Sequence, residues 1–263
     1  MTQTATQLEP PATLREKLSR DEVSAGDTVS LLGFDVRIKD VENFHTLYKN
    51  IFYRRLYHFH CDHPDPRVLD CGSHIGLSIL YFKHSYPAAR VIGFEPDPIV
   101  LDYLRENIGR NGLTDVEIVP AALAKGTDRS ILYSDELSGG TLAEYVGDGV
   151  DPSTPMSEVA CVRLRDYLDG PVDFLKMTIE GAETDVLLDC ENRLRRVARM
   201  VVEYHHLPGR PRTLHKILGV LDRCGFDYLI HDFDAETNPK SQPPFRLSPR
   251  SRYSLLIYAQ RRA

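Results

Sequence analysis

The sequence predicts an α/β fold with one doubly wound, mainly parallel β-sheet whose two faces are covered by helices. From Arg67 onward, short runs of β-branched or apolar residues alternate with segments of helical periodicity. A glycine-containing turn, at residues 71–76, follows the first of these runs. Before the last run, a loop with Pro239, Pro243 and Pro244 is too short and irregular for a crossover helix. The final strand should therefore run antiparallel to its neighbour.

The positions of the strands and helices follow from this alternation. The seven strands are expected at Arg67–Cys71, Arg90–Phe94, Val116–Val119, Val172–Thr178, Arg199–Tyr204, Tyr228–His231 and Tyr253–Tyr258. Helices are expected at Ile75–His84, Ile99–Asn111, Ala182–Cys190 and Pro211–Cys224, the last followed by Gly225 as a helix stop. Residues 124–168 break the alternation with SGG and DPSTP, which predicts a β-hairpin and mobile loops over the sheet.

The composition is that of an ordinary globular chain. With 263 residues, of which 42% are hydrophobic and 27% charged, it is long enough for a substantial core. A net charge of -6 argues against broad electrostatic capture of nucleic acid. The 5 cysteines form no CxxC pair, so neither a disulfide framework nor a zinc site is implied. The sequence has neither an apolar signal-peptide core nor a membrane-spanning stretch, so we expect a cytoplasmic protein with no membrane partner.

The segment before the sheet divides into two parts. Residues 1–25 are polar, carry Pro10 and Pro11, and show only a short helical pattern, which predicts a flexible arm. Residues 26–66 are rich in aromatics and histidines, and their apolar residues from Phe44 to Leu56 recur at helical spacing. This pattern predicts an N-terminal helical cap over a ligand pocket. The sheet domain then occupies residues 67–263.

The end of the first strand predicts a ligand site. In VLDCGSHIG, Asp70 stands at the strand end, and Gly72 and Gly76 allow a tight turn that passes close to a ligand. In doubly wound sheets, the ligand crevice lies beyond the carboxyl ends of the strands at the switch in strand order. The Asp70 carboxylate can accept from an ammonium or a bound water, which suits a methionine moiety better than a pyrophosphate. The alternative is a glycine turn with a solvated aspartate.

The next two strand ends complete this site. In VIGFEPDP, Glu95 follows a strand at an offset from Asp70 close to the ~20 residues at which Rossmann-like folds place a ribose-binding acid. Its two carboxylate oxygens match the two vicinal hydroxyls of a ribose. After the third strand, Pro120, Ala121 and Ala122 can offer an adenine ring a flat apolar wall, although packing alone explains them nearly as well.

Two later strand ends carry the candidate chemistry, in VDFLKMTIEGAETDVL and VVEYHH. Carboxylate and imidazole groups that converge from adjacent strand ends can deprotonate a substrate hydroxyl or bind a divalent metal. Glu183 fits a helix-start carboxylate that interacts with the helix dipole at least as well. We expect the base to be His205 or His206, supported by Glu203, and the other histidine to be structural.

A cluster of histidines, YHFHCDH at residues 57–63, has the spacing of metal ligands. Its histidines alternate through a segment that also supplies aromatic residues. Mixed polar and aromatic side chains are typical of small-molecule pockets. We therefore favour substrate contacts or a polar lid over a metal site, and assign no metal ligand.

Taken together, these motifs resemble the FkbM family of S-adenosylmethionine-dependent methyltransferases. The resemblance rests on VLDCGSHIG, VIGFEPDP, PAAL, VDFLKMTIEGAE and VVEYHH, in this order, and covers roughly Tyr48 to Tyr258. It implies a class I methyltransferase fold, which is Rossmann-like with an antiparallel last strand. It also implies S-adenosylmethionine as methyl donor, S-adenosylhomocysteine as product, and transfer to a hydroxyl of a sugar or natural-product scaffold.

The resemblance also implies roles for individual residues. The cofactor-binding residues would be Asp70, Gly72, Ser73, Gly76, Glu95, Pro96, Ala121 and Ala122. The catalytic and substrate-side residues would be Thr178, Glu180, Glu203, His205 and His206. The family usually has an aspartate where this chain has Thr178, which leaves metal dependence open.

The sequence thus predicts an enzyme that methylates a hydroxyl of a small molecule and has no nucleic-acid partner. Homo-oligomerisation is left open. One alternative is N- or C-methylation, or a cyclisation, with the same cofactor in natural-product biosynthesis. Another is a non-catalytic cofactor-binding module, which the missing aspartate at Thr178 suggests. An NAD-dependent dehydrogenase is disfavoured by the DxGxxxG pattern and by the antiparallel last strand.

Overall fold

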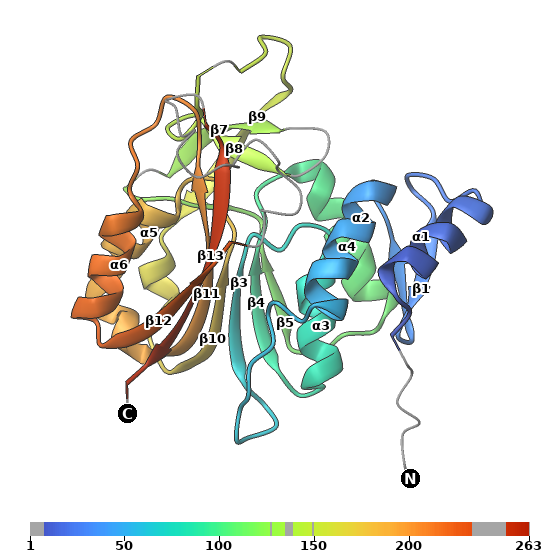
Figure 1. Ribbon diagram of the computed structural model, residues 1–263, viewed down its shortest axis with the longest axis horizontal. Helices are drawn as coiled ribbons and strands as arrows, with labels where there is room; N and C mark the ends of the chain where they lie inside the picture. The colour runs from blue at the N-terminus through green and yellow to red at the C-terminus, as the bar shows by residue number, and fades with distance from the viewer. Residues whose placement is uncertain (1–7, 127, 135–138, 149, 233–250, 263) are drawn as a thin grey trace.

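The computed structural model describes residues 8–126, 128–134, 139–148, 150–232 and 251–262 (Figure 1). Its centre is a seven-stranded sheet in the order β12-β13-β11-β10-β3-β4-β5. These strands are β3 (Arg67–Cys71), β4 (Arg90–Phe94), β5 (Val116–Val119), β10 (Val172–Met177), β11 (Val197–His206), β12 (Phe226–His231) and β13 (Tyr253–Arg261). In this sheet β13 runs antiparallel to both of its neighbours and the other pairs are parallel. The predicted doubly wound sheet with an antiparallel last strand is confirmed.

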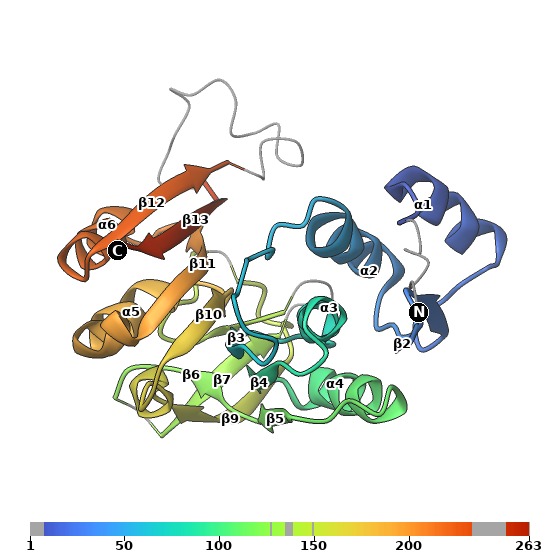
Figure 2. The ribbon, with the colours of Figure 1, turned by 90° about the horizontal axis from the view of Figure 1, so that it is seen from below.

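Helices cover both faces of this sheet (Figure 2). On one face, α3 (Leu77–Ser85) and α4 (Pro98–Arg110) contribute to a core with strand residues such as Val68 and Val201. On the other, α5 (Glu183–Asp189) and α6 (Leu214–Arg223) pack on the alternate strand residues, such as Leu69 and Val202. Because both faces of the central strands are buried, β3, β4 and β10 have mostly apolar sequences. This explains why they could be predicted closely, and helix α6 ends before Gly225, as expected.

The N-terminal part is more ordered than the sequence suggested. It contains α1 (Pro11–Arg20), β1 (Thr28–Leu31), β2 (Phe34–Arg37), α2 (Val41–Leu47) and the π-helix η1 (Tyr48–Tyr53). Leu14 and Leu18 of α1 are buried, and the Tyr48 hydroxyl donates to the Glu9 carbonyl over 2.6 Å. Residues 8–25 thus include a packed helix, residues 1–7 lie outside the described residues, and the flexibility expected for residues 1–25 stays a prediction. The boundary between cap and sheet domain at residue 66 stays a prediction.

The segment at residues 124–168 also differs from its prediction. A second, four-stranded sheet has the order β6-β9-β7-β8. Its strands are β6 (Ala122–Leu123), β7 (Arg129–Ser134), β8 (Gly140–Leu142) and β9 (Met156–Val162), and the short 3-10 helix η2 (Leu164–Tyr167) follows. The expected hairpin is present as β7 and β8, but β9 adds a third antiparallel partner that pairs with β7. A further 3-10 helix, η3 (Glu191–Arg196), precedes β11.

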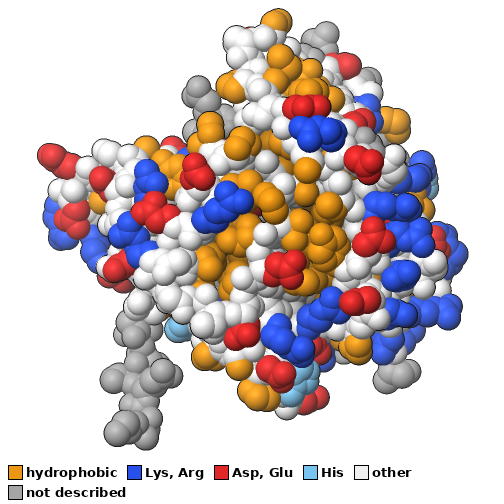
Figure 3. All heavy atoms as spheres, turned by 180° about the vertical axis from the view of Figure 1, so that it is seen from behind, with side chains coloured by type: hydrophobic (Ala, Val, Ile, Leu, Met, Phe, Trp, Pro, Cys, Tyr) orange, Lys and Arg blue, Asp and Glu red, His pale blue; other side chains and the backbone are white. Residues whose placement is uncertain are grey.

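The outer surface mixes side-chain types. On the face turned away from the viewer of Figure 1, hydrophobic side chains gather in the middle and side chains of both charges surround them (Figure 3). Within the described part of the chain, every helix is too short or too polar to cross a membrane.

Removing the buried side chain of Leu18 tests the packing of α1. Leu18 is only 2% exposed, and deleting a buried leucine side chain costs about 2 to 5 kcal/mol. We expect Leu18→Ala to lower the free energy of unfolding by this amount in urea denaturation. The matched control Glu16→Ala, on the exposed side of the same helix, should change it by less than about 0.5 kcal/mol. Equal effects of the two substitutions would mean that α1 does not pack.

Candidate active site

A cavity of about 260 Å³ opens at the carboxyl ends of the central strands. It lies beside β3, which β4 and β10 flank on opposite sides, so strand order switches here. This is the position at which doubly wound sheets bind ligands. The predicted site residues that line the cavity are Gly72, Ser73, Glu95, Pro96, Ala121, Ala122, Thr178, Glu180 and Glu203. Among the described residues, the lining does not include the predicted Asp70, Gly76, His205 and His206.

The turn after β3 has a shape that only glycine permits. Gly72 has φ 87°, and a Cβ there would lie 1.9 Å from the carbonyl oxygen of Thr178. Gly76 has φ 93°, and a Cβ there would lie 2.8 Å from a methyl group of Leu104. Between them, the Ser73 hydroxyl donates to the Asp70 carbonyl over 3.0 Å. The turn therefore presents backbone, rather than side chains, to the cavity.

Asp70 does not line the cavity but lies in the protein interior next to this turn. Its carboxylate is fully buried, accepts from the Ser78 hydroxyl over 2.6 Å, and lies 3.4 Å from the ammonium of Lys176. Lys176 also donates to the carbonyl of Gly72. The sequence predicted that Asp70 accepts from the ammonium of a methionine moiety or from a bound water. In the structure, the ammonium next to Asp70 is that of Lys176. Sequence analysis missed Lys176, although a charged residue inside the apolar run VDFLKM was the signal for a buried ion pair.

Glu95 points into the cavity from the end of β4. Its Oε2 accepts from the backbone N–H of His74 over 2.8 Å, and its Oε1 accepts from the N–H of Asp97 over 3.0 Å. Burial raises the pKa of Glu95 to about 7, against the opposing effect of these two hydrogen bonds. Because each carboxylate oxygen has more than one lone pair, both keep acceptor capacity toward a ligand. Pro96 continues this wall of the cavity.

A cluster of ionisable side chains lies at the ends of β10 and β11. His205 Nδ1 lies 2.8 Å from Glu183 Oε1. His205 Nε2 lies 3.2 Å from Glu203 Oε1 and 3.5 Å from Glu180 Oε1. Burial lowers the pKa of His205, but the facing carboxylates outweigh burial and raise this pKa well above the ordinary value. The ring is therefore a cation that holds the glutamates in place, with Arg252 3.7 Å from Glu180 on the outer side.

This arrangement changes the roles expected for the two histidines. A protonated His205 ring cannot accept the proton of a substrate, and it stands behind Glu180 and Glu203, which do line the cavity. His206 is 2% exposed and packs against the Tyr253 ring, with 4.9 Å between ring centroids. Neither histidine is among the described residues that line the cavity, and the expectation that one of them is the base stays a prediction. The carboxylates of Glu203 and Glu180 are the acceptors that the cavity offers.

Two uncharged groups adjoin Glu203. The Thr178 hydroxyl donates to Glu203 Oε2 over 3.5 Å, and it shares a hydrogen bond with the Tyr57 hydroxyl. Burial raises the pKa of Tyr57 far above its usual range, so this phenol stays neutral. The Lys176 ammonium lies over the Tyr57 ring, 5.7 Å from its centroid. Glu180 itself has φ 50°, a left-handed conformation that is uncommon and costly for a side chain of this kind.

Only the first residue of the YHFHCDH segment reaches the cavity. Tyr57 lines it, together with the polar side chains of Asn43, Thr46 and Asn50 from α2 and η1. The three histidines bond elsewhere: His58 to Arg55 and Tyr81, His60 to Asp62, and His63 to Asp65 and Asp173. The prediction that these histidines form substrate contacts or a polar lid is therefore wrong.

Raising the pH tests the charge on His205. Because its pKa in the folded state is raised above about 6.5, its stabilising contribution is complete below that pH and is lost as the pH rises through the raised pKa. The charges that face the ring are those of Glu180, Glu183 and Glu203, with Arg252 beyond Glu180. We expect the difference in unfolding free energy between wild type and His205→Gln, measured in urea, to shrink from about pH 6 to pH 9. His206→Gln, at a histidine whose pKa burial lowers, should show no such loss. A difference for His205→Gln that does not change with pH would contradict a charged ring.

Comparison with known proteins identifies several that are similar to this chain. The family model of the methyltransferase FkbM domain matches residues 70–228. Methyltransferase sdnD of Sordaria araneosa is 27% identical over 212 residues, which cover 69% of this chain and 81% of that protein. The 2-O-methyltransferase NoeI of Sinorhizobium fredii is 26% identical over 161 residues, which cover 54% of this chain and 64% of that protein.

Among solved structures, methyltransferase FkbM from Methylobacillus flagellatus has the same fold. The superposition has a TM-score of 0.51 at 17% sequence identity. It covers 80% of this chain and 47% of that chain, so the present chain spans less than half of that structure.

Proposed function

The chain belongs to the FkbM methyltransferase family, and from this premise we propose that it transfers the methyl group of S-adenosylmethionine to a hydroxyl oxygen of a small molecule. The observation that carries the proposal is the distribution of acids in one cavity. Glu95 stands at one strand end, and Glu180 and Glu203 stand at the ends of β10 and β11. One pocket therefore offers Glu95 as an acceptor for the hydroxyls of a ribose. It also offers Glu180 and Glu203 as separate acceptors for a proton.

The residues that line the cavity fit this cofactor. Glu95 is held by two backbone N–H groups so that both its oxygens can accept from the ribose hydroxyls. The turn at Gly72 and Ser73 brings backbone to the place of the amino-acid moiety. Ala121 and Ala122 supply small apolar contacts for the adenine. Asn43 also lines the cavity, and its side-chain amide could exchange hydrogen bonds with a ligand.

The chemistry then requires a positioned acceptor and a place for its proton. S-adenosylmethionine supplies a methyl group on a positively charged sulfur. Glu203 accepts the proton of the substrate hydroxyl as the oxygen is methylated, which is general-base catalysis. The His205 ring, whose Nε2 lies 3.2 Å from Glu203 Oε1, keeps this carboxylate oriented. Glu180 and the hydroxyl of Thr178 bind and orient the acceptor in a largely closed pocket, where positioning supplies much of the rate.

The acceptor class follows from the cavity and the relatives. Asn43, Thr46 and Asn50 line the same cavity as Glu180 and Glu203, within a lining that is otherwise rich in apolar residues. Such a lining suits a hydroxylated scaffold, such as a sugar or a natural product with several oxygens. One relative is named a 2-O-methyltransferase, and a 29% identical one is part of an antimetabolite synthetase of Pseudomonas aeruginosa. N- or C-methylation, cyclisation, and cofactor binding without turnover are the alternatives that product analysis decides.

Cofactor binding is expected to depend on the ionised Glu95. Two charge-assisted hydrogen bonds to a ribose are worth about 3 kcal/mol or more, so Glu95→Ala should weaken S-adenosylmethionine binding by at least about 100-fold in calorimetry. Since the pKa of Glu95 is about 7, wild-type affinity should fall below that pH by up to about tenfold per unit. Glu95→Gln keeps an acceptor oxygen but should lose this pH dependence. Wild-type affinity in Glu95→Ala, with the fold verified by circular dichroism, would remove Glu95 from the site.

Turnover is expected to depend on Glu203. Glu203→Gln should lower S-adenosylhomocysteine formation on a pool of hydroxylated acceptors by about 10²- to 10⁴-fold, because the amide cannot take the proton. Cofactor affinity should change little, and the exposed Glu158→Gln on β9 is the matched control. Unchanged turnover in Glu203→Gln would exclude it as base. Cofactor binding by the wild type without turnover, with and without chelator, would favour a non-catalytic module, whereas the mass and connectivity of any product identify the methylated atom.

A further inference from the structure

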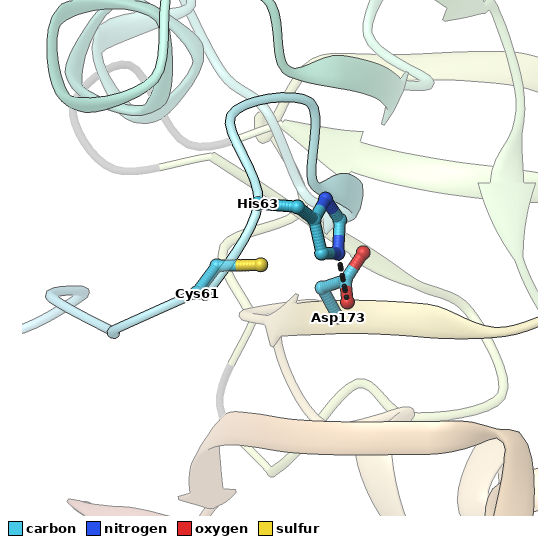
Figure 4. Close-up of side chains that lie close together, drawn as sticks. All are labelled: Cys61, His63 and Asp173. Carbon is cyan, nitrogen blue, oxygen red and sulfur yellow. Dashed lines mark hydrogen bonds and ion pairs between the residues drawn. The ribbon is translucent and has the colours of Figure 1, made fainter.

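A second group of ligand-type side chains lies close together near the starts of β3 and β10 (Figure 4). The cavity lies at the other, carboxyl ends of these strands. Cys61 and His63 belong to the loop before β3, and Asp173 is the second residue of β10. One donor atom from each of the three side chains, sulfur, nitrogen and oxygen, lies within 4.8 Å of the other two. Asp173 precedes Phe174, which pairs with Val68 near the start of β3, so the group joins the amino-terminal ends of two adjacent strands.

We propose that Cys61, His63 and Asp173 form a zinc site. Tetrahedral zinc with its usual bond lengths separates nitrogen and oxygen donors by about 3.3 Å, and sulfur from either of them by about 3.6 Å. His63 Nε2 lies 3.2 Å from Asp173 Oδ1, which is already this spacing. The sulfur of the half-buried Cys61 lies within 4.8 Å of both, so zinc binding requires it to approach by at most about 1.2 Å. His63 is 46% exposed, so water can fill the fourth position.

The surroundings orient these three ligands as the outer shell of a metal site does. His63 Nδ1, on the far side of the ring, lies 3.1 Å from Asp65 Oδ1. A carboxylate on the second nitrogen of a ligating histidine is the common arrangement at zinc. The other oxygen of Asp173 accepts from the backbone N–H of Arg67 over 2.8 Å. The backbone N–H of Cys61 donates to the Tyr86 hydroxyl over 2.9 Å.

The chemistry of the donors selects zinc among common cations. A mixed set of thiolate, imidazole and carboxylate suits a borderline-soft transition metal, whereas magnesium and calcium prefer oxygen alone. Binding releases the thiol proton of Cys61, and the resulting thiolate with the Asp173 carboxylate balances the two charges of the ion. Without a metal, His63 simply bridges Asp65 and Asp173, and that bridge makes no use of Cys61. A thiolate bound to the metal therefore distinguishes the zinc-bound protein from the metal-free protein.

The position of the site indicates a structural role. It ties the loop before β3 to β10, and β3 continues from there to Asp70 and the glycine turn of the cavity. The strand of five residues spans roughly 16 Å, so the ion does not reach the reacting atoms. The inference is independent of the proposed methyl transfer.

Metal binding by the full chain tests this site. After chelator treatment, the protein is titrated with Zn²⁺ against a chromophoric chelator, and in parallel with Co²⁺. We expect one Zn²⁺ per chain and a thiolate-to-cobalt charge-transfer absorption in the near ultraviolet. Cys61→Ser and Asp173→Asn should weaken Zn²⁺ binding by well over about tenfold, and Asp65→Asn by about tenfold. Zn²⁺ should raise the unfolding temperature of the wild type and not that of Cys61→Ser.

The control is His60→Ala, in the same loop, whose side chain is 80% exposed and which is not one of the three ligands. It should bind Zn²⁺ as the wild type does. Wild-type Zn²⁺ affinity weaker than about 10⁻⁴ M overturns the proposal. So does equal binding by the wild type and a folded Cys61→Ser, or a Co²⁺ spectrum without the thiolate band. Loss of binding in Glu203→Gln, with Cys61→Ser unaffected, would place the metal at the cavity and equally overturn it.

Discussion

The buried ammonium of Lys176 is the interaction on which the shape of the cavity depends. From β10 it reaches the carboxylate of Asp70 and the carbonyl of Gly72, so one side chain fixes both the end of β3 and the turn after it. Leaving one partner of a buried ion pair alone costs about 3 to 5 kcal/mol, so each of these charges requires the other. The backbone of Thr178 then approaches Gly72 so closely that no side chain fits there. The ends of β3 and β10, with the turn at Gly72, thus form the rigid floor of the cavity. The remaining side chains of the cavity are placed relative to this floor.

The charges around this floor suit the proposed methyl donor, a cation that loses its charge as the methyl group is transferred. A strongly anionic pocket binds a sulfonium well, but it stabilises the ground state more than the transition state, in which the charge is disappearing. The charged His205 ring moderates this effect, because it sits among Glu180, Glu183 and Glu203 and offsets part of their negative charge. Asp70 is likewise compensated by Lys176. The pocket therefore keeps carboxylates for hydrogen bonding and proton transfer without a large net field.

The sequence predicted the central sheet well because its signals are local. Each strand from Arg67–Cys71 onward is an apolar run bounded by turn residues, and the glycine turn follows directly. What it could not predict depends on contacts between distant residues. His205 looks like a base in sequence, but it becomes a cation only when Glu180 and Glu183 fold against it. The second sheet depends on pairings between distant residues, such as Ala122 with Cys161. Likewise, His63 meets Asp173 only through the register of β3 with β10.

Thr178 shows how a departure from the family pattern can leave the site working. The backbone of this residue shapes the cavity, since its carbonyl oxygen excludes a side chain at Gly72, and any side chain at position 178 preserves that contact. A threonine in place of the usual aspartate removes one negative charge beside Glu203 and supplies a hydroxyl that donates to it. Glu203 thus lies beside the His205 ring, 3.2 Å away, and the Thr178 hydroxyl, rather than beside a second carboxylate at position 178. The substitution therefore argues against a carboxylate pair that shares a metal or a proton at this strand end, and for one carboxylate that acts with a neutral hydrogen-bonding neighbour.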